Sequence, residues 1–201
     1  MKFDSVILIG STNSNKLLEL YREFNSLPLS FITPQELGTS YGAIPEVEES
    51  ADTYLGNALL KAETFSKWSG LPVLADDSGL EVDCLGGAPG IYSARLASTE
   101  ENRITELVKL MAQNGVSFSK ALFRTVLVFY RPCGEFSHTE GVVEGTIGTI
   151  PRGQKGWGYE PLFVPNGEVH TIAELKDFGA DPDSHRRRAA RSMKEILALE
   201  I

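Results

Sequence analysis

Residues 74–95 read LADDSGLEVDCLGGAPGIYSAR and combine two apolar runs, adjacent acids and turn-forming glycines in one short stretch. The first run, residues 72–75, is long enough for a buried strand, which we expect to end at Asp76 and Asp77. Neighbouring carboxylates repel one another unless a cation, hydrogen bonds or water offset the repulsion. The stretch therefore predicts either an Asx-type turn between two strands or a site for a cation such as Mg²⁺.

The composition limits the class of protein. A length of 201 residues with 42% hydrophobic content predicts one globular domain over residues 1–201, with room for a subsidiary lobe. The net charge of −8 argues against a nucleic-acid-binding surface. Two cysteines support neither a disulfide framework nor a zinc site. Since no apolar run reaches the length of a signal peptide or a membrane span, we expect a cytoplasmic protein without membrane partners.

A first polar cluster, STNSNK at residues 11–16, follows the apolar run at residues 6–9 and precedes apolar positions at helical spacing. A small polar loop at the amino end of a helix can bind an anion. The alternative is that Asn13 or Ser14 caps the helix and Lys16 is solvated. The spacing of a Walker A loop is absent, which argues against a P-loop enzyme.

A second cluster follows the acidic residues around Glu49. Asn57 and Lys61 are four residues apart in a predicted helix, so they share one face and point toward a common partner. The alternative for Lys61 is a solvated helix face. Farther along, residues 121–130 and 135–150 are rich in β-forming residues and predict a long hairpin. Glycines in its second strand predict bulges or bends, and they are Gly141, Gly145 and Gly148.

Two more polar segments lie near the carboxyl end. Residues 151–161, PRGQKGWGYEP, have the composition of a mobile loop whose aromatic rings stack on a base, although a buried Trp157 is the alternative. Ser184 caps a predicted terminal helix, and cations in its first turn oppose the helix dipole. This favours an anionic or keto-bearing partner, and the alternative is a salt-bridged surface cluster.

Together these segments resemble the inosine triphosphate pyrophosphatase family over nearly the whole chain. The motifs that carry the resemblance are STNSNK at 11–16, Glu49 with Asn57 and Lys61, residues 75–95, GWGYEP at 156–161, and SHR at 184–186. The resemblance implies a mixed α/β fold with a long central β-sheet flanked by helices, and two lobes with an active-site cleft between them. It also implies a homodimer. The implied activity is Mg²⁺-dependent hydrolysis of (deoxy)inosine and xanthosine triphosphates to monophosphate and pyrophosphate, which clears deaminated purines from the nucleotide pool.

The resemblance also assigns roles by position. It implies Glu49, Asp77 and Asp76 as metal ligands, with Asp77 as the proton acceptor and Lys61 as a further catalytic residue. Lys16 and Lys61 fall where the family grips the triphosphate. The implied substrate contacts come from Ser11, Thr12, Asn13, Lys16, Lys61, Ser78, Trp157, Gly158, Tyr159, Glu160, His185 and Arg186. Of these, the last two would recognise the keto edge of a purine, so that ITP or XTP is preferred over ATP.

This sequence departs from the family pattern in three places. The family loop more often reads Phe-Gly-Tyr-Asp-Pro. This chain has Trp157 in place of the Phe and Glu160 in place of the Asp. A family lysine four residues before the SHR serine is Ala180 here, and the candidate replacements are Lys176 and Lys155. The acidic residue often found before Asn57 is a glycine, Gly56. Two alternatives stay open: a Maf-like pyrophosphatase acting on other modified nucleotides, and a noncatalytic nucleotide-binding regulator.

Overall fold

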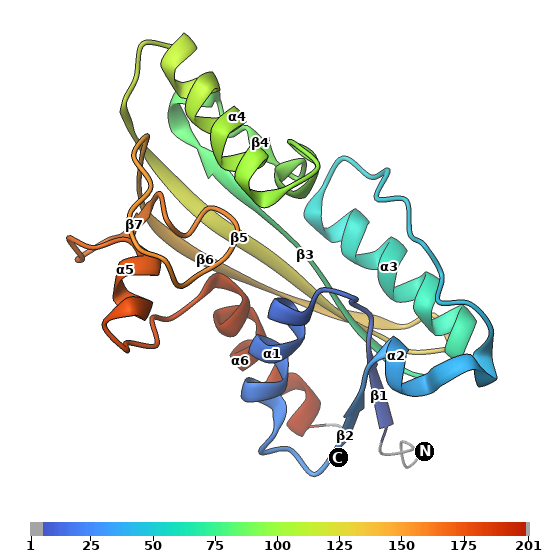
Figure 1. Ribbon diagram of the computed structural model, residues 1–201. Coiled ribbons are helices and arrows are strands. Elements are labelled where there is room, and N and C mark those ends of the chain that lie inside the picture. The colour runs from blue at the N-terminus through green and yellow to red at the C-terminus, as the bar shows by residue number, and fades with distance from the viewer. Residues whose placement is uncertain (1–5, 200–201) are drawn as a thin grey trace. The chain divides into compact units, whose positions relative to one another are not determined.

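The chain has a mixed α/β fold, which a computed structural model describes for residues 6–199 (Figure 1). The strands within those residues are β1 (Val6–Ile9), β2 (Ser30–Ile32), β3 (Val73–Val82), β4 (Pro89–Gly90), β5 (Phe118–Tyr130), β6 (Phe136–Gly148) and β7 (Phe163–Pro165). They form one sheet in the order β2-β1-β3-β5-β6-β7, with β4 paired to β3. Because β1 is parallel to β2 and β3 whereas β7 is antiparallel to β6, the predicted mixed α/β class is confirmed.

Helices connect the strands. They are α1 (Ser14–Phe24), α2 (Pro34–Leu37), α3 (Tyr54–Ser69), α4 (Glu100–Gln113), α5 (Ile172–Asp177) and α6 (His185–Ala198). Three short 3₁₀ segments complete the set: η1 (Gly38–Tyr41), η2 (Asp83–Leu85) and η3 (Ser93–Arg95). Among residues 6–199, no helix is both long enough and apolar enough to span a bilayer.

The chain divides into two compact units. The first contains residues 6–77, 125–141 and 186–199, and the second contains Ser78–Arg124 and Val142–His185. Because these boundaries fall inside β3, β5, β6 and α6, four elements pass without a break from one unit into the other.

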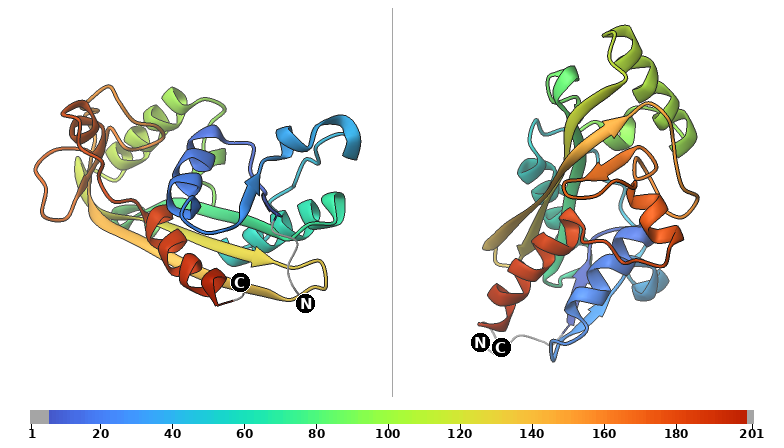
Figure 2. Two further views of the ribbon diagram at one scale, coloured as in Figure 1. Left: turned by 90° about the horizontal axis from the view of Figure 1, so that it is seen from below. Right: turned by 90° about the vertical axis from the view of Figure 1, so that its left-hand side faces the viewer.

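In the first unit, helices cover both faces of the sheet. Leu74 packs with residues of α1 and α6, whereas Val73 and Ala75 pack with residues of α3. Successive strand residues point to opposite faces, so α1 and α6 lie on one face of β3 and α3 lies on the other (Figure 1). Figure 2 shows α6 lying along the hairpin, where Thr139 Oγ1 donates a hydrogen bond of 2.8 Å to the carbonyl oxygen of Ala189.

The strand β3 continues through the acidic pair, so the predicted end of this strand at Asp76 is wrong. Asp76 and Asp77 lie in the middle of Val73–Val82, which also excludes an Asx-type turn at this point. The reason is that alternation sends the two carboxylates to opposite faces, where each has its own cationic neighbour. Repulsion between them therefore does not have to break the strand.

The second unit has its own core and contains part of the predicted hairpin. Apolar side chains from β3, β5, β6, α4 and α5 form one buried cluster that includes Leu80, Phe123 and Leu107. The two long strands β5 and β6 are neighbours in the sheet and are joined by a short turn, in which Arg131 N donates to Glu135 O at 2.8 Å. The hairpin prediction is confirmed.

Candidate active site

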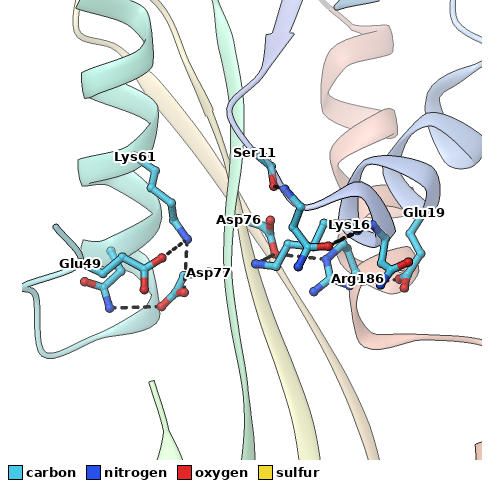
Figure 3. A network of polar contacts seen from close by, with 11 residues as sticks. Ser11, Lys16, Glu19, Glu49, Lys61, Asp76, Asp77 and Arg186 are labelled. Atoms are coloured by element: carbon cyan, nitrogen blue, oxygen red, sulfur yellow. Dashed lines mark hydrogen bonds and ion pairs between the residues drawn. The ribbon is translucent and has the colours of Figure 1, made fainter. Parts of the chain in front are cut away.

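The alternation of β3 separates the two aspartates into two polar groups, one on each face of the strand. Figure 3 shows Asp77 with Lys61 and Glu49 on the side of α3, and Asp76 with Lys16 and Arg186 on the side of α1 and α6. Both groups belong to the first unit. We call them the Asp77 group and the Asp76 group.

The Asp77 group is built on α3. Lys61 Nζ donates to Glu49 Oε1 at 2.8 Å and to Asp77 Oδ1 at 3.3 Å. Asn57 Nδ2 donates to the other oxygen of Asp77 at 3.2 Å. Asn57 and Lys61 are one helical turn apart, so the prediction that they point to a common partner is confirmed. Asn57 Oδ1 also accepts from Ala51 N at 3.0 Å, which ties the acidic segment to the helix.

The charges in the Asp77 group alter one another's pKa. Burial raises the pKa of Asp77 above its ordinary value, and the ammonium of Lys61 only partly offsets this. Burial works in the opposite direction on Lys61, but the carboxylates of Asp77, Asp76 and Glu49 outweigh it and raise the pKa of Lys61. The group therefore places one ammonium between two acidic side chains, and burial makes Asp77 more basic than an exposed aspartate.

The Asp76 group connects α1 and α6 to β3. Asp76 Oδ2 accepts from Lys16 Nζ at 2.9 Å and from Arg186 Nε at 3.1 Å. Arg186 Nη1 donates to Glu19 Oε2 at 3.2 Å, and the Arg186 side chain is fully buried. Burial alone would raise the pKa of Asp76, but Lys16, Arg186 and Lys61 together hold it well below its usual range. Asp76 therefore stays ionised to a lower pH than an exposed aspartate does.

The loop at residues 11–16 caps α1. Asn13 Oδ1 accepts from Asn15 N at 3.0 Å and from Lys16 N at 3.3 Å, so the predicted cap is confirmed. The alternative of a solvated Lys16 is wrong, because its ammonium pairs with the buried carboxylate of Asp76. Ser11 Oγ accepts from Asn13 N at 3.2 Å, and Thr12 is exposed next to it. Contacts of Ser11, Thr12 and Asn13 with substrate stay a prediction.

The three predicted metal ligands do not form one cluster. Within residues 6–199, no group of three or more His, Cys, Asp and Glu side chains lies close enough to hold a metal ion. Glu49 and Asp77 do converge on a single cationic atom, Lys61 Nζ, whereas Asp76 points to the other face of the strand. Two hard oxygen donors that already share a cation fit Mg²⁺, with further ligands supplied by water or phosphate. Asp76 pairs instead with Lys16 and Arg186, so its role as a metal ligand stays a prediction.

In the second unit, acidic side chains bind the main chain of the loop at residues 154–158, which we call the aromatic loop. Trp157 N donates to Glu160 Oε2 at 2.9 Å, and Gly158 N donates to Glu100 Oε2 at 3.3 Å. Tyr159 is only 5% exposed, and its hydroxyl donates to Ser93 O at 2.8 Å. Burial raises the pKa of Tyr159 to about 12. Tyr159 therefore anchors the base of the loop.

The chain crosses between the two units at two of the predicted motifs. His185 is the first residue of α6 and belongs to the second unit, where its ring stacks on Phe123 with centroids 4.9 Å apart. Arg186 belongs to the first unit and pairs with Asp76, so the alternative of an exposed salt-bridged cluster does not apply to it. Ser78 follows Asp77 in β3 as the first residue of the second unit, and it is half-buried.

Sequence reasoning missed three acidic residues, one in the Asp76 group and two that bind the aromatic loop. Glu19 lies three residues after Lys16 in α1, and that spacing places both on one helix face, so it was a usable signal. Glu100 and Asp177 also bind main-chain amides of the aromatic loop. Nothing in their local sequence indicates this, because their partners are 58 and 23 residues away, respectively.

Comparison with known proteins finds relatives that match nearly the whole of this chain. The Ham1 family model matches residues 7–196. The chain is similar to a dITP/XTP pyrophosphatase of Bacillus licheniformis, with 40% identity over 196 residues that cover 95% of this chain and 97% of that protein. A dITP/XTP pyrophosphatase of Streptococcus agalactiae is 39% identical over 199 residues, which span 97% of this chain and 60% of that longer protein.

Solved structures of two Ham1 proteins are similar to this chain in fold. A HAM1 protein from Coxiella burnetii superposes with a TM-score of 0.84 and 33% identity, covering 96% of this chain and 98% of that one. The Ham1 protein of Staphylococcus aureus gives a TM-score of 0.81 and 32% identity, covering 98% of this chain and 100% of that one.

Proposed function

Because this chain belongs to the Ham1 family, we propose that it hydrolyses deoxyinosine, inosine and xanthosine triphosphates to the nucleoside monophosphate and pyrophosphate. One observation of the structure carries the proposal. Glu49 and Asp77 converge on one cationic atom, and Lys61 supplies that atom. The site thus combines acids for a metal with an ammonium for phosphate, which is what the hydrolysis of a metal-bound triphosphate needs.

We assign Asp77 as the group that accepts a proton from water. The water oxygen bonds to the α-phosphorus, the bond from that phosphorus to the bridging oxygen breaks, and pyrophosphate leaves with the electron pair. Burial raises the pKa of Asp77, and a more basic carboxylate is a better proton acceptor near neutral pH. Asn57 keeps that carboxylate in place through its other oxygen.

The lysines offset the charge of the triphosphate. Lys61 and Lys16 lie on opposite faces of β3, each already balanced by an aspartate. Glu49 and Asp77 would hold Mg²⁺, which when bound would neutralise phosphoryl oxygens and make the attacking water more acidic. Lys61 would then be released from part of its pairing and could donate to a phosphate oxygen instead.

A pyrophosphate-release assay tests the proposed function. We expect turnover of ITP, dITP and XTP to exceed that of ATP, and we expect EDTA to abolish it and Mg²⁺ to restore it. A clear preference for ATP would overturn the proposal. Release only from modified pyrimidine triphosphates would favour a Maf-like enzyme, and tight nucleotide binding without any release would favour a regulator.

Finer features of the assignment are proposals as well. We propose that the protein acts in the cytoplasm, as a homodimer. We also propose that residues 1–201 work as one domain, since β3, β5 and β6 are shared by both units. Light scattering after gel filtration tests the dimer, for which the expected mass is twice 22.0 kDa.

A further inference from the structure

Carboxylates hold almost every main-chain amide of the aromatic loop, residues 154–158. The bonds run from Gln154 N to Asp177 Oδ2 at 2.8 Å, from Lys155 N to Asp177 Oδ1 at 2.9 Å, from Trp157 N to Glu160 Oε2 at 2.9 Å and from Gly158 N to Glu100 Oε2 at 3.3 Å. Hydrogen bonds to charged acceptors are stronger than neutral ones. The main chain of this segment is therefore tied at both ends, and the mobility of the loop stays a prediction.

Two glycines show how closely this part of the chain packs against α5 and Glu160. Gly153 has a φ of +86°, and a Cβ there would lie 2.5 Å from the main-chain nitrogen of Glu174 in α5. Gly156 has a φ of +135°, and a Cβ there would lie 2.7 Å from Glu160 Oε2. Side chains at these positions would strain the main chain as well as clash with these neighbours. The loop is therefore packed directly on α5 and on the Glu160 carboxylate.

The carboxylate of Glu160 is in turn held by Lys176. Lys176 Nζ donates to Glu160 Oε1 at 2.8 Å and to Oε2 at 2.7 Å, so both oxygens are bound. The side chains are 28% and 12% exposed, which makes the pair partly buried and less screened than a surface ion pair. Lys176 and Asp177 are adjacent at the end of α5, so this one helix end holds both sides of the loop.

We propose that Lys176 is a positioning residue for the nucleobase, which acts through Glu160 to keep the main chain of Trp157 in a fixed place. The inference rests on the proposed function and on the predicted contact of Trp157 with the base. It adds that affinity for the nucleotide depends on an ion pair that does not itself touch the substrate. Lys176 supplies the cation that holds Glu160, the residue that binds the main chain of the loop.

The test compares Lys176→Met with Lys109→Met. Lys109 lies in the same unit and pairs with Glu106 on an exposed helix face, so its loss removes a lysine and an ion pair far less buried than that of Lys176. In Lys176→Met we expect KM for ITP to rise about tenfold, the cost of losing a charged hydrogen bond, with kcat changed by less than about twofold. Lys176→Arg should restore KM because it keeps the cation.

A second measurement follows the loop without any substrate. Amide hydrogen exchange of residues 154–158 should become about tenfold faster in Lys176→Met than in Lys109→Met. If Lys176→Met fails to fold, Glu160→Gln serves in its place, because the amide oxygen still accepts from Trp157 N but no longer attracts the ammonium. We then expect the same faster exchange of the loop amides, which does not depend on any contact of Glu160 with substrate.

The outcomes separate this inference from the proposed function. Unchanged exchange in the loop overturns the positioning role, and so does faster exchange with an unchanged KM. An equal fall of kcat in Lys176→Met and its Arg variant would also overturn it, because that pattern indicates general structural damage. If the wild type releases pyrophosphate from no nucleotide, the proposed function fails, and the exchange experiment alone then supports or overturns the role of Lys176 in ordering the loop.

Discussion

At the scale of single residues, the contrast between Asp76 and Asp77 has the widest consequences. The two are chemically identical neighbours, yet burial raises the pKa of Asp77, while two close cations hold the pKa of Asp76 well below its usual range. One carboxylate is therefore more basic than an exposed aspartate, and the other is more acidic. The difference arises only because a strand sends them to opposite faces.

Replacement of Asp77 by Asn should remove catalysis and leave the fold intact. The amide cannot accept a proton from water, so we expect kcat for pyrophosphate release to fall by about 10²- to 10⁴-fold. The amide oxygen can still accept from Lys61, so the circular dichroism spectrum should match that of the wild type. Near-full turnover of a folded Asp77→Asn protein would reject Asp77 as the proton acceptor.

Replacement of Asp76 by Asn should act on stability. It would leave Lys16 and the buried Arg186 without their shared counter-charge, which we expect to lower the free energy of unfolding by about 3 kcal/mol at pH 7. Urea denaturation measures this. The control is Glu63→Gln, which removes a carboxylate from an exposed pair with Lys67 and should cost less than about 0.5 kcal/mol.

The same variant should change how stability depends on pH. The folded protein keeps Asp76 ionised at a pH where the unfolded chain already binds a proton, so its stabilising effect is full above about pH 5 and declines as the pH falls through the unfolded value near 3.9. The difference in unfolding free energy between wild type and Asp76→Asn should therefore shrink between about pH 5 and pH 3. A constant difference would mean that Asp76 is not the group responsible.

Sequence reasoning singled out charged residues that form the two polar groups, but it did not predict how they pair. Lys16, Lys61 and the two aspartates were all identified, because acids next to a strand and cations near a helix start are local signals. The partner of Lys16 is 60 residues away, and the partner of Arg186 is 110 residues away from it. Pairing over such separations depends on how α1, α6 and β3 pack together, which no local pattern encodes. The structure pairs Asp76 with these two cations, and its predicted role beside the metal stays a prediction.

At the scale of elements, a glycine in β6 is required by a neighbouring strand. A Cβ on Gly145 would lie 2.2 Å from the carbonyl oxygen of Val164 in β7 and 2.8 Å from the ring of Phe163. We expect Gly145→Ala to lower the free energy of unfolding by about 1 to 3 kcal/mol, because the two strands must separate to make room. Thermal or urea denaturation measures the loss.

The matched control for this substitution lies three residues later in the same strand. Gly148 has no neighbour closer than 3.6 Å to an added Cβ, so Gly148→Ala should change stability by less than about 0.5 kcal/mol. Equal effects of the two substitutions would show that backbone entropy decides the outcome rather than the approach of β7.

Elements with a clear period were predicted well, and β3 was not. The helix with Asn57 and Lys61 and the long hairpin follow from apolar spacing and from β-forming residues. The strand β3 contains Asp76, Asp77 and Gly79, which are rare inside strands, so a sequence reading ends it too early. What overrides the propensity is tertiary: cations from three helices neutralise the acids.

At the scale of the whole molecule, a bound substrate should stabilise the protein. Inosine triphosphate with an imido group between the α- and β-phosphates cannot be cleaved at that bond, so it can be present at equilibrium with Mg²⁺. At about one hundred times its dissociation constant it should add about 2.7 kcal/mol, which raises the melting temperature by about 5 to 10 °C for a chain of this size. Scanning fluorimetry measures the shift, and the same analogue of ATP should give a smaller one.

The bond from Lys61 to two acids also bears on how the protein behaves between turnovers. The ammonium of Lys61 balances the charges of Glu49 and Asp77. When a divalent ion leaves with the product, these two acids therefore still have a cation between them. Lys61 thus supplies a cation when no metal ion is bound. We therefore expect the divalent ion to bind together with each nucleotide and to leave with pyrophosphate, while the protein stays folded.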